Sequence, residues 1–323
     1  MEYSIKDIAR IIGSKSSVDS EDKISLLLTD SRRLSAPEQT LFFAIKTKTN
    51  DGHRYIGELY KAHVRNFVVN ELRPEFDEMK DANFLLVPDT VKALQKLAIY
   101  HRKRFNIPVI GITGSNGKTI VKEFLYQLLR KEFNIVRSPR SYNSQIGVPL
   151  SIWQLNEKTQ LGIFEAGISQ PDEMERLQQI IQPTVGIITN IGEAHQENFI
   201  SLNQKLLEKL TLFNESEAII YDGDDDFISN GIEQACLSHK AIVWSRTDSE
   251  APLFIEKIEK KDNETLIHCT MLGFERSVTI PFTDDASIKD VLQCMALMLY
   301  LKPTSLDEVE NFKHLEPVDM RLD

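Results

Sequence analysis

The chain has 323 residues, 27% of them charged, and a formal net charge of −10. This length is typical of two domains, and the acidic balance argues against a nucleic-acid-binding surface, which needs clustered Lys and Arg. No apolar run approaches the roughly 20 residues that cross a bilayer, and the N-terminus lacks the layout of a signal peptide. Three cysteines without paired close spacing fit a reduced protein with neither disulfides nor a zinc site. We therefore expect a cytoplasmic globular protein without a membrane span.

The first 105 residues have the pattern of a small α/β domain. Apolar residues in Ile5–Ile12 recur at helical spacing, with Ser4 as a candidate N-cap and Gly13 as a candidate C-cap. A second helix is predicted over 90–104, and a domain boundary follows it near residue 105, where Asn-Ile-Pro interrupts the pattern. Short apolar runs between these helices predict strands at 26–28, 41–45, 67–69 and 84–87.

Residues 106–316 predict a second α/β domain with a mainly parallel sheet. The predicted strands of this sheet are separated by segments long enough for right-handed crossovers. They are 109–113, 161–165, 185–190 and 218–221. Three later runs, at 254–259, 264–271 and 275–281, resemble a short antiparallel meander. Helices are predicted at 119–133 and 287–301, and 317–323 is the expected start of a linker.

A glycine-rich segment, Gly-Ile-Thr-Gly-Ser-Asn-Gly-Lys-Thr at 111–119, is the strongest local signal. It joins a buried strand to a helix, so its backbone N–H groups and the helix N-terminus favour phosphate binding. Lys118 is predicted to reach the β- and γ-phosphates of ATP, and the Thr119 hydroxyl to bind Mg²⁺. Ile112 stands where the general pattern has its first glycine. The predicted nucleotide-binding residues of this loop are Gly114, Ser115, Asn116, Gly117, Lys118 and Thr119.

This loop resembles the nucleotide loop of the Mur ligase superfamily, which also contains folylpolyglutamate synthases. Further segments are similar to the members that join D-alanyl-D-alanine to UDP-N-acetylmuramoyl-tripeptide. In chain order they are Thr-Asp-Ser-Arg at 29–32, Leu-Phe-Phe-Ala-Ile at 41–45, Asn-Asp-Gly-His at 50–53, Ser-Tyr-Asn-Ser-Gln-Ile-Gly-Val-Pro-Leu at 141–150, Phe-Glu-Ala-Gly at 164–167 and Ile-Thr-Asn-Ile-Gly-Glu-Ala-His at 188–195. The resemblance covers nearly the whole chain, and its motifs keep the family's order.

Metal-binding residues are expected at the ends of the parallel strands. Glu165 ends an apolar strand, at the sheet edge where ligands bind, and carboxylate oxygens suit Mg²⁺. The resemblance implies that His195 binds a second magnesium ion. It also implies that Lys209 carries CO₂ as a carbamate that takes part in metal binding, which requires a neutral amine. Lys205 is the rival for that role.

Other expected contacts depend on the resemblance alone. It implies that Ser31 and Arg32 contact the UDP portion of the substrate, for which the forked guanidinium is suited. His53 belongs to a matching segment and is a further candidate for substrate binding. Asn143 is expected near the substrate. The nucleotide contacts that it implies are Asn190 and Arg321.

Two departures from the family pattern affect these expectations. Asp290 and Gln293 stand where the family has asparagines near the adenine, which puts the adenine contacts in doubt. The family's third domain would follow Arg321, whereas this sequence stops at Asp323. We therefore expect a chain that binds ligands without completing the reaction. In some bacteria the D-alanyl-D-alanine-adding ligase is fused to an alanine racemase, so the parent protein is a candidate for such a fusion.

The expected activity is that of an ATP-dependent amide ligase with ATP and Mg²⁺ as cofactors. The carboxylate of the UDP-linked peptide would attack the γ-phosphate, and the amine of D-alanyl-D-alanine would then displace phosphate from the acyl phosphate. Alternatives are another Mur ligase, a folylpolyglutamate synthase, or a non-catalytic nucleotide-binding module of a fusion protein. The motifs in the first domain argue against the folate enzyme, whose substrate has no UDP.

Overall fold

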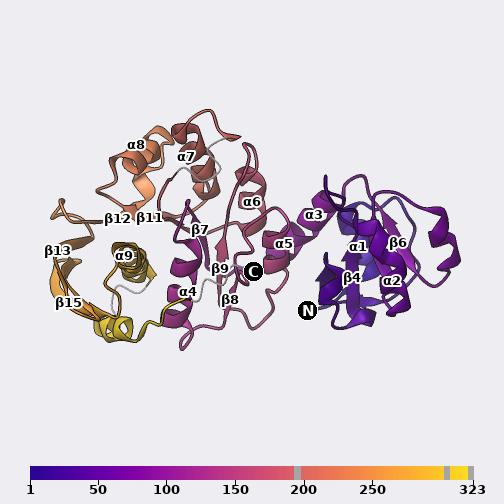
Figure 1. The fold of residues 1–323 in the computed structure, drawn as a ribbon, viewed down its shortest axis with the longest axis horizontal. Helices are drawn as coiled ribbons and strands as arrows, with labels where there is room; N and C mark the ends of the chain where they lie inside the picture. Colours follow the sequence, from indigo (N-terminus) through magenta and orange to yellow (C-terminus); the bar gives the residue numbers. More distant parts are fainter. Residues whose placement is uncertain (193–197, 302–305, 319–323) are drawn as a thin grey trace. The chain divides into compact units, whose positions relative to one another are not determined.

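The computed structural model describes residues 1–192, 198–301 and 306–318. The chain divides into two compact units, the first formed by 1–106 and 152–157 and the second by 107–151 and 158–323. Within the described ranges, no helix is long and apolar enough to cross a membrane. Figure 1 shows the helices and strands of both units, which are described separately below.

The first unit is built on a four-stranded parallel sheet in the order β3-β4-β5-β6. Phe42 and Phe67 from this sheet pack with Ile56 and Leu59 of α2 in an apolar core. The sheet strands are β3 (Leu26–Leu28), β4 (Thr40–Phe43), β5 (Asn66–Val69) and β6 (Asn83–Leu86), with β1 (Tyr3–Ser4) and β2 (Lys23–Ile24) as a separate antiparallel ribbon. The helices are α1 (Ile5–Ile12), α2 (Ile56–Lys61) and α3 (Thr90–Arg102).

The predicted caps of the first helix are present. The Ser4 hydroxyl accepts a hydrogen bond from the backbone N–H of Asp7, and Gly13 ends α1 in the left-handed conformation with φ of 73°. Each contact satisfies a backbone group that the helix itself leaves unpaired. The sequence pattern and the observed helix therefore coincide at both ends.

A buried histidine attaches the segment 152–157 to the first unit. His101, near the end of α3, accepts a hydrogen bond at Nδ1 from the Tyr3 hydroxyl (2.8 Å) and donates from Nε2 to the Leu155 carbonyl (2.9 Å). Burial lowers the pKa of His101 to about 4, so the neutral ring makes both contacts. The Trp153 indole adds a hydrogen bond to the Ser25 carbonyl. Local sequence patterns do not predict that residues 152–157, which follow the start of the second unit, belong to the first unit.

The second unit contains a nine-stranded sheet in the order β15-β14-β13-β12-β11-β10-β7-β9-β8. From β13 through β8 all neighbours are parallel, whereas β13, β14 and β15 pair antiparallel. This confirms the predicted α/β class with a mainly parallel sheet and an antiparallel meander. The strands are β7 (Val109–Thr113), β8 (Ile135–Arg137), β9 (Leu161–Glu165), β10 (Val185–Ile188), β11 (Ala218–Asp222), β12 (Ala241–Ser245), β13 (Leu253–Lys260), β14 (Thr265–Met271) and β15 (Phe274–Ile280).

Helices cover both faces of this sheet (Figure 1). On one face, α4 packs against β7, β8 and β9, and α9 packs against β11, β12 and α4, in a shared core that includes Ile110, Ile112, Phe124 and Leu292. On the other face lie α6, α7 and α8. The carboxyl ends of β7, β9 and β10 therefore meet at an edge flanked by both layers, where ligands bind in sheets of this type. The helices are α4 (Lys118–Leu129), α5 (Gly147–Ile152), α6 (Met174–Ile181), α7 (Leu202–Leu210), α8 (Asp226–Gln234) and α9 (Asp285–Leu301).

Candidate functional site

The glycine-rich loop leaves β7 and is held against the end of β10. Gly114 has φ of 141°, and a Cβ there would lie 2.0 Å from the Thr189 hydroxyl, so only glycine fits. The Ser115 N–H donates to the Asn190 carbonyl (2.8 Å), and the Asn116 N–H donates to the Asn190 side chain (3.1 Å). Asn190, predicted as a nucleotide contact, thus also fixes the shape of the loop.

Lys118 is the first residue of α4 and folds back over the loop. Its Nζ donates to the carbonyl oxygens of Gly114 (3.0 Å) and Ser115 (3.3 Å). Burial lowers the pKa of this amine, while the charge of Glu165 opposes the effect. The ammonium therefore lies at the mouth of a loop whose N–H groups surround the helix N-terminus, as binding of a phosphate anion requires.

Thr119 and Glu165 lie together at the ends of α4 and β9. The Thr119 hydroxyl donates to Glu165 Oε2 (3.1 Å), and the Glu165 side chain is fully buried. The other oxygen, Oε1, is 2.9 Å from Lys122 Nζ but has no partner with hydrogen-bond geometry. This pair of oxygen groups has the hard donor chemistry that Mg²⁺ prefers.

Lys122 was not among the residues predicted for the site. Its side chain is fully buried, and besides Glu165 it contacts Glu123 (3.3 Å) and the Arg140 carbonyl. Lys122 lies one helical turn after Lys118, so the i,i+4 spacing was the available signal. That spacing does not show that the side chain turns inward to a strand-end carboxylate.

A pocket of about 330 Å³ opens on one side of the loop. Lys209 on α7 is almost completely buried there, and its Nζ donates to the Gly114 carbonyl (3.2 Å). Burial, reinforced by the charges of Lys118 and Lys205, lowers the pKa of Lys209 to about 7. Lys205 is also buried and donates to the Gly192 carbonyl. Below, this region is called the lysine pocket; its lining includes Gly114, Ser115, Lys118, Asn143, Gln145, Glu173, Lys205 and Lys209.

A second pocket, of about 490 Å³, lies along the loop and the start of α9. Among its polar residues, Lys289 forms an ion pair with Asp222 (3.1 Å). Burial raises the pKa of Asp290 to about 7. Below, this region is called the acidic pocket. Its lining includes Asn116, Gly117, Lys118, Thr119, Asn143, Asn190, Asp222, Asp225, Lys289, Asp290 and Gln293.

Two of the predicted site residues, His195 and Arg321, lie outside the described residues. Their expected roles in metal and nucleotide binding stay predictions. The other predicted residues of the second unit gather at the two pockets or at the Thr119–Glu165 pair between them.

In the first unit, Ser31 and Arg32 form a short 3₁₀ turn after β3. Arg32 donates from Nε (2.9 Å) and Nη2 (2.8 Å) to the two carboxylate oxygens of Asp30, which lowers the pKa of that carboxyl. The side chain is 86% exposed, so its outer N–H groups face solvent. A pocket of about 430 Å³ surrounds this turn; it is lined by Thr29, Asp30, Ser31, Arg32, Asn50 and Tyr55.

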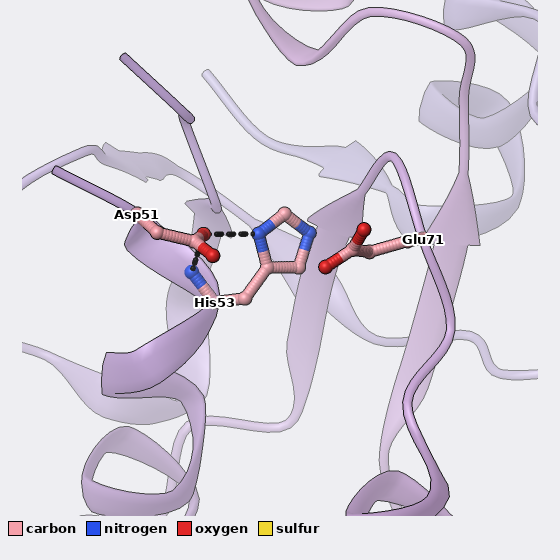
Figure 2. Close-up of side chains that lie close together, drawn as sticks. All are labelled: Asp51, His53 and Glu71. Atoms are coloured by element: carbon pink, nitrogen blue, oxygen red, sulfur yellow. Dashed lines mark hydrogen bonds and ion pairs between the residues drawn. The ribbon is translucent and has the colours of Figure 1, made fainter. Parts of the chain in front are cut away.

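His53 is buried beside this pocket and does not line it. Its Nδ1 contacts Asp51 Oδ1 (2.7 Å), and Figure 2 shows its other nitrogen facing Glu71. The ligand atoms of Asp51, His53 and Glu71 lie within 4.8 Å of one another. However, Arg73 donates to both carboxylates, so a metal ion would have to displace a guanidinium. The geometry favours an ion-pair network that holds the loop carrying Asn50 and Tyr55.

Comparison with known proteins agrees with this architecture. The family model for the Mur ligase middle domain matches residues 112–298. The UDP-N-acetylmuramoyl-tripeptide--D-alanyl-D-alanine ligase of Bacillus subtilis is 27% identical over all of this chain and 69% of its own length. A crystal structure of MurF from Acinetobacter baumannii, 22% identical, superposes with a TM-score of 0.87 over the whole chain and 70% of its own length. MurF ligase from Thermotoga maritima in complex with ADP, also 22% identical, gives 0.78 over 90% of this chain and 66% of its own length. The family match spans more than half of the sequence, and the chain therefore belongs to the Mur ligase family.

Proposed function

We propose that this chain binds the substrates of an ATP-dependent amide ligase of peptidoglycan precursor synthesis. The reaction joins D-alanyl-D-alanine to UDP-N-acetylmuramoyl-tripeptide through an acyl phosphate. The observation that carries this proposal is the position of the phosphate loop, between the Thr119–Glu165 pair and the lysine pocket. The name of the Bacillus relative, which matches over the full chain, supports the choice of substrates.

The triphosphate would bind along the loop with its γ-phosphate toward the lysine pocket. Lys118 now donates to two loop carbonyls, and phosphate oxygens would take over those contacts. The N–H groups at the start of α4 add further donors. Because Lys118 and Lys205 converge there, the negative charge that develops during phosphoryl transfer would meet their positive charge.

Thr119 and Glu165 fit a magnesium ion. Both oxygen groups sit beside the loop, and a cation would share the Glu165 carboxylate with the Thr119 hydroxyl at Oε2 and with the Lys122 ammonium at Oε1. When bound, Mg²⁺ would neutralise charge on the phosphate oxygens. The Lys122 ammonium balances part of the charge of this buried carboxylate. His195 is proposed as a ligand of a second ion.

Carbamylation of Lys209 is part of the proposal. The reaction requires the free amine, and burial lowers the pKa of Lys209 to about 7, so a large neutral fraction exists near neutral pH. Lys205, the rival, is equally enclosed but has a different partner, the Gly192 carbonyl. Titration with ¹³C-bicarbonate followed by NMR should give a carbamate signal that Lys209→Met removes and Lys205→Arg retains. The opposite pattern would assign the carbamate to Lys205.

The first unit is proposed to bind the UDP portion of the substrate. The exposed outer face of Arg32 and the Ser31 hydroxyl lie in a polar pocket whose size suits a nucleotide fragment. The ion pair with Asp30 fixes the orientation of the guanidinium before a diphosphate arrives. The substrate of a folylpolyglutamate synthase has no UDP group to occupy such a pocket. Because ATP and a UDP-linked precursor are its substrates, we place the reaction in the cytoplasm.

The chemistry proceeds in two displacements. The terminal carboxylate of the tripeptide attacks the γ-phosphorus, forming the acyl phosphate and releasing ADP. The amine of D-alanyl-D-alanine then attacks the acyl carbon, and phosphate leaves as the amide bond forms. Asn143 lines both pockets and would orient the reacting carboxylate. The chain spans 69% of the Bacillus relative, and the rest of that relative's length is proposed to help place the amine.

The test is ADP formation as a function of the UDP-linked tripeptide. The chain should bind Mg-ATP and UDP-N-acetylmuramoyl-tripeptide in separate titrations, and ADP release should require both. Lys118→Ala should abolish the release. Binding of both ligands without any ADP release would favour the non-catalytic nucleotide-binding module. ADP release that depends on a different UDP-linked carboxylate would point to another Mur ligase.

A further inference from the structure

The start of α9 places two polar side chains in the wall of the acidic pocket. Asp290 is 6% exposed and Gln293 is 2% exposed. A Cβ added to Gly117, which has φ of 82°, would lie 2.4 Å from Asp290 Oδ1. The Asp290 carboxylate therefore lies directly against the loop that binds the phosphates in the proposed function. A nucleotide held by this loop would extend its sugar and base into this pocket.

Both side chains present hydrogen-bond acceptors that have no partner among the described residues. Gln293 Nε2 donates to the Ile188 carbonyl (3.3 Å), which fixes the orientation of the amide because a carbonyl can only accept. Its Oε1 is buried without a hydrogen bond. Within the described ranges, Asp290 likewise has neither a hydrogen-bond partner nor an ion pair. The neighbouring Lys289 instead pairs with Asp222.

Gln293 Oε1 is a buried acceptor, and Asp290 presents its carboxylate to the pocket. Such acceptors need donors from water or from a bound ligand. Phosphate groups supply none, so the complementary groups must be on the sugar or the base. Guanine presents the N1–H and the 2-amino group side by side on one edge, and a carboxylate accepts from both. Adenine presents one amino group beside N1, which is itself an acceptor. An asparagine side chain, with one donor and one acceptor, matches adenine better than a carboxylate does.

We propose that Asp290, together with Gln293, sets the purine preference of this nucleotide site and admits GTP alongside ATP. The proposal rests on the proposed function, because it needs a triphosphate on the loop at 114–119. The phosphate chemistry is unchanged, since the two nucleotides differ only in the base. The loop and its lysines determine whether a triphosphate binds, and the residues on α9 determine which base is favoured.

The test is the ratio of Mg-GTP to Mg-ATP affinity in the wild type and in Asp290→Asn, a variant of nearly equal size. Burial raises the pKa of Asp290 to about 7, so titrations belong at about pH 8.5, where the carboxylate is ionised. The wild type should bind Mg-GTP at least as tightly as Mg-ATP. Asp290→Asn should shift the ratio toward ATP by about tenfold or more, the effect of one hydrogen bond to a charged group. Mg-ITP, which lacks the 2-amino group, should bind the wild type about tenfold more weakly than Mg-GTP.

Asp222→Asn is the matched control, because it removes an acidic group from the same pocket. It should change the affinities for ATP and GTP by similar factors. A GTP-to-ATP ratio that stays within about twofold in Asp290→Asn would overturn the proposal, as would an equal shift in Asp222→Asn. If neither triphosphate binds the wild type, the proposed function fails instead. Binding of both nucleotides with an unchanged ratio rejects only the role of Asp290.

Discussion

The two pockets that flank the phosphate loop carry opposite charge, although both are lined by the same loop. Lys118 lines both pockets. Lys205 and Lys209 lie with it on one side, and Asp222, Asp225 and Asp290 lie on the other, where Lys289 pairs with Asp222. Burial disfavours the charged form in both places. It lowers the pKa of Lys209 and raises that of Asp290, each to about 7. In the proposed function, the site would thus separate the anionic part of a nucleotide from its neutral base. The predictions below test the groups on each side of that division.

Removing the carboxylate between the two pockets should have the largest effect. Glu165→Gln leaves the buried Lys122 ammonium with only the Glu123 carboxylate, at 3.3 Å, as counter-ion, so the free energy of unfolding should fall by about 3 kcal/mol, the lower end for a broken buried pair. Urea denaturation measures this loss. The double variant Glu165→Gln with Lys122→Met should recover most of the stability but still need more Mg²⁺ to bind ATP. If the double variant regains both the stability and the Mg²⁺ dependence of the wild type, Glu165 is a structural partner of Lys122 and not a magnesium ligand.

On the lysine side, Lys118→Ala should weaken Mg-ATP binding by about 100-fold or more, because a partly desolvated phosphate contact is lost. Calorimetric titration measures the affinity. Lys131→Ala, an exposed lysine just after α4, is the control and should bind ATP like the wild type. Equal affinities in all three proteins would contradict the assignment of the loop.

The pKa of Lys209 predicts how stability depends on pH. The unfolded chain holds this proton up to about 10.5, whereas the folded chain releases it at about 7. Between these values the unfolded state binds more protons, so stability rises with pH from about 7 to about 10.5. This contribution is lost progressively as pH falls over the same range and does not change further below about pH 7. The wild type should gain roughly 2 kcal/mol over Lys209→Met between about pH 7.5 and 9. Parallel stability curves for the two proteins would mean that the amine keeps its ordinary pKa.

How far the sequence predicts this architecture depends on whether the signal is local. The capped helix at Ile5–Ile12, the strand before the loop and the meander were recognisable because caps, apolar runs and turns are local features. The strands β8 and β12 are not among the predicted strands. β8 has only three half-buried residues, whereas β12 has an apolar run, Ala-Ile-Val-Trp, that carries a strand signal. The attachment of 152–157 to the first unit depends on His101, fifty residues away, and has no local signal.

The site shows the same division between local and distant information. The loop residues and Glu165 come directly after apolar strands in the sequence. Because the carboxyl ends of parallel strands meet at one edge of the sheet, their grouping could be expected. The position of Lys122 could not be expected, because it depends on this side chain of α4 turning inward to Glu165 at the end of β9. The sequence likewise does not show that Gln293 Oε1 lacks a partner. This follows only from the structure, in which Gln293 Nε2 donates to the Ile188 carbonyl. The sequence indicates which residue types lie at the edge of the sheet. Only the packed structure shows which of their polar atoms lack a hydrogen-bond partner.

The pocket in the first unit extends the comparison to a second proposed anion site, one that would rely on a single exposed guanidinium. Arg32 is held by Asp30 but has no loop of N–H groups around it, so its contribution should be smaller than that of Lys118. Arg32→Ala should weaken binding of UDP-N-acetylmuramoyl-tripeptide by about tenfold, the lower end for a hydrogen bond to a charged group, because solvent screens the contact. Arg33→Ala, the adjacent exposed arginine, is the control and should change the affinity by less than about twofold. The effect of Arg32→Ala should also shrink as salt is raised, whereas a contact to the uracil would not respond. Equal losses in both variants would indicate general electrostatic attraction and remove the specific role of Arg32.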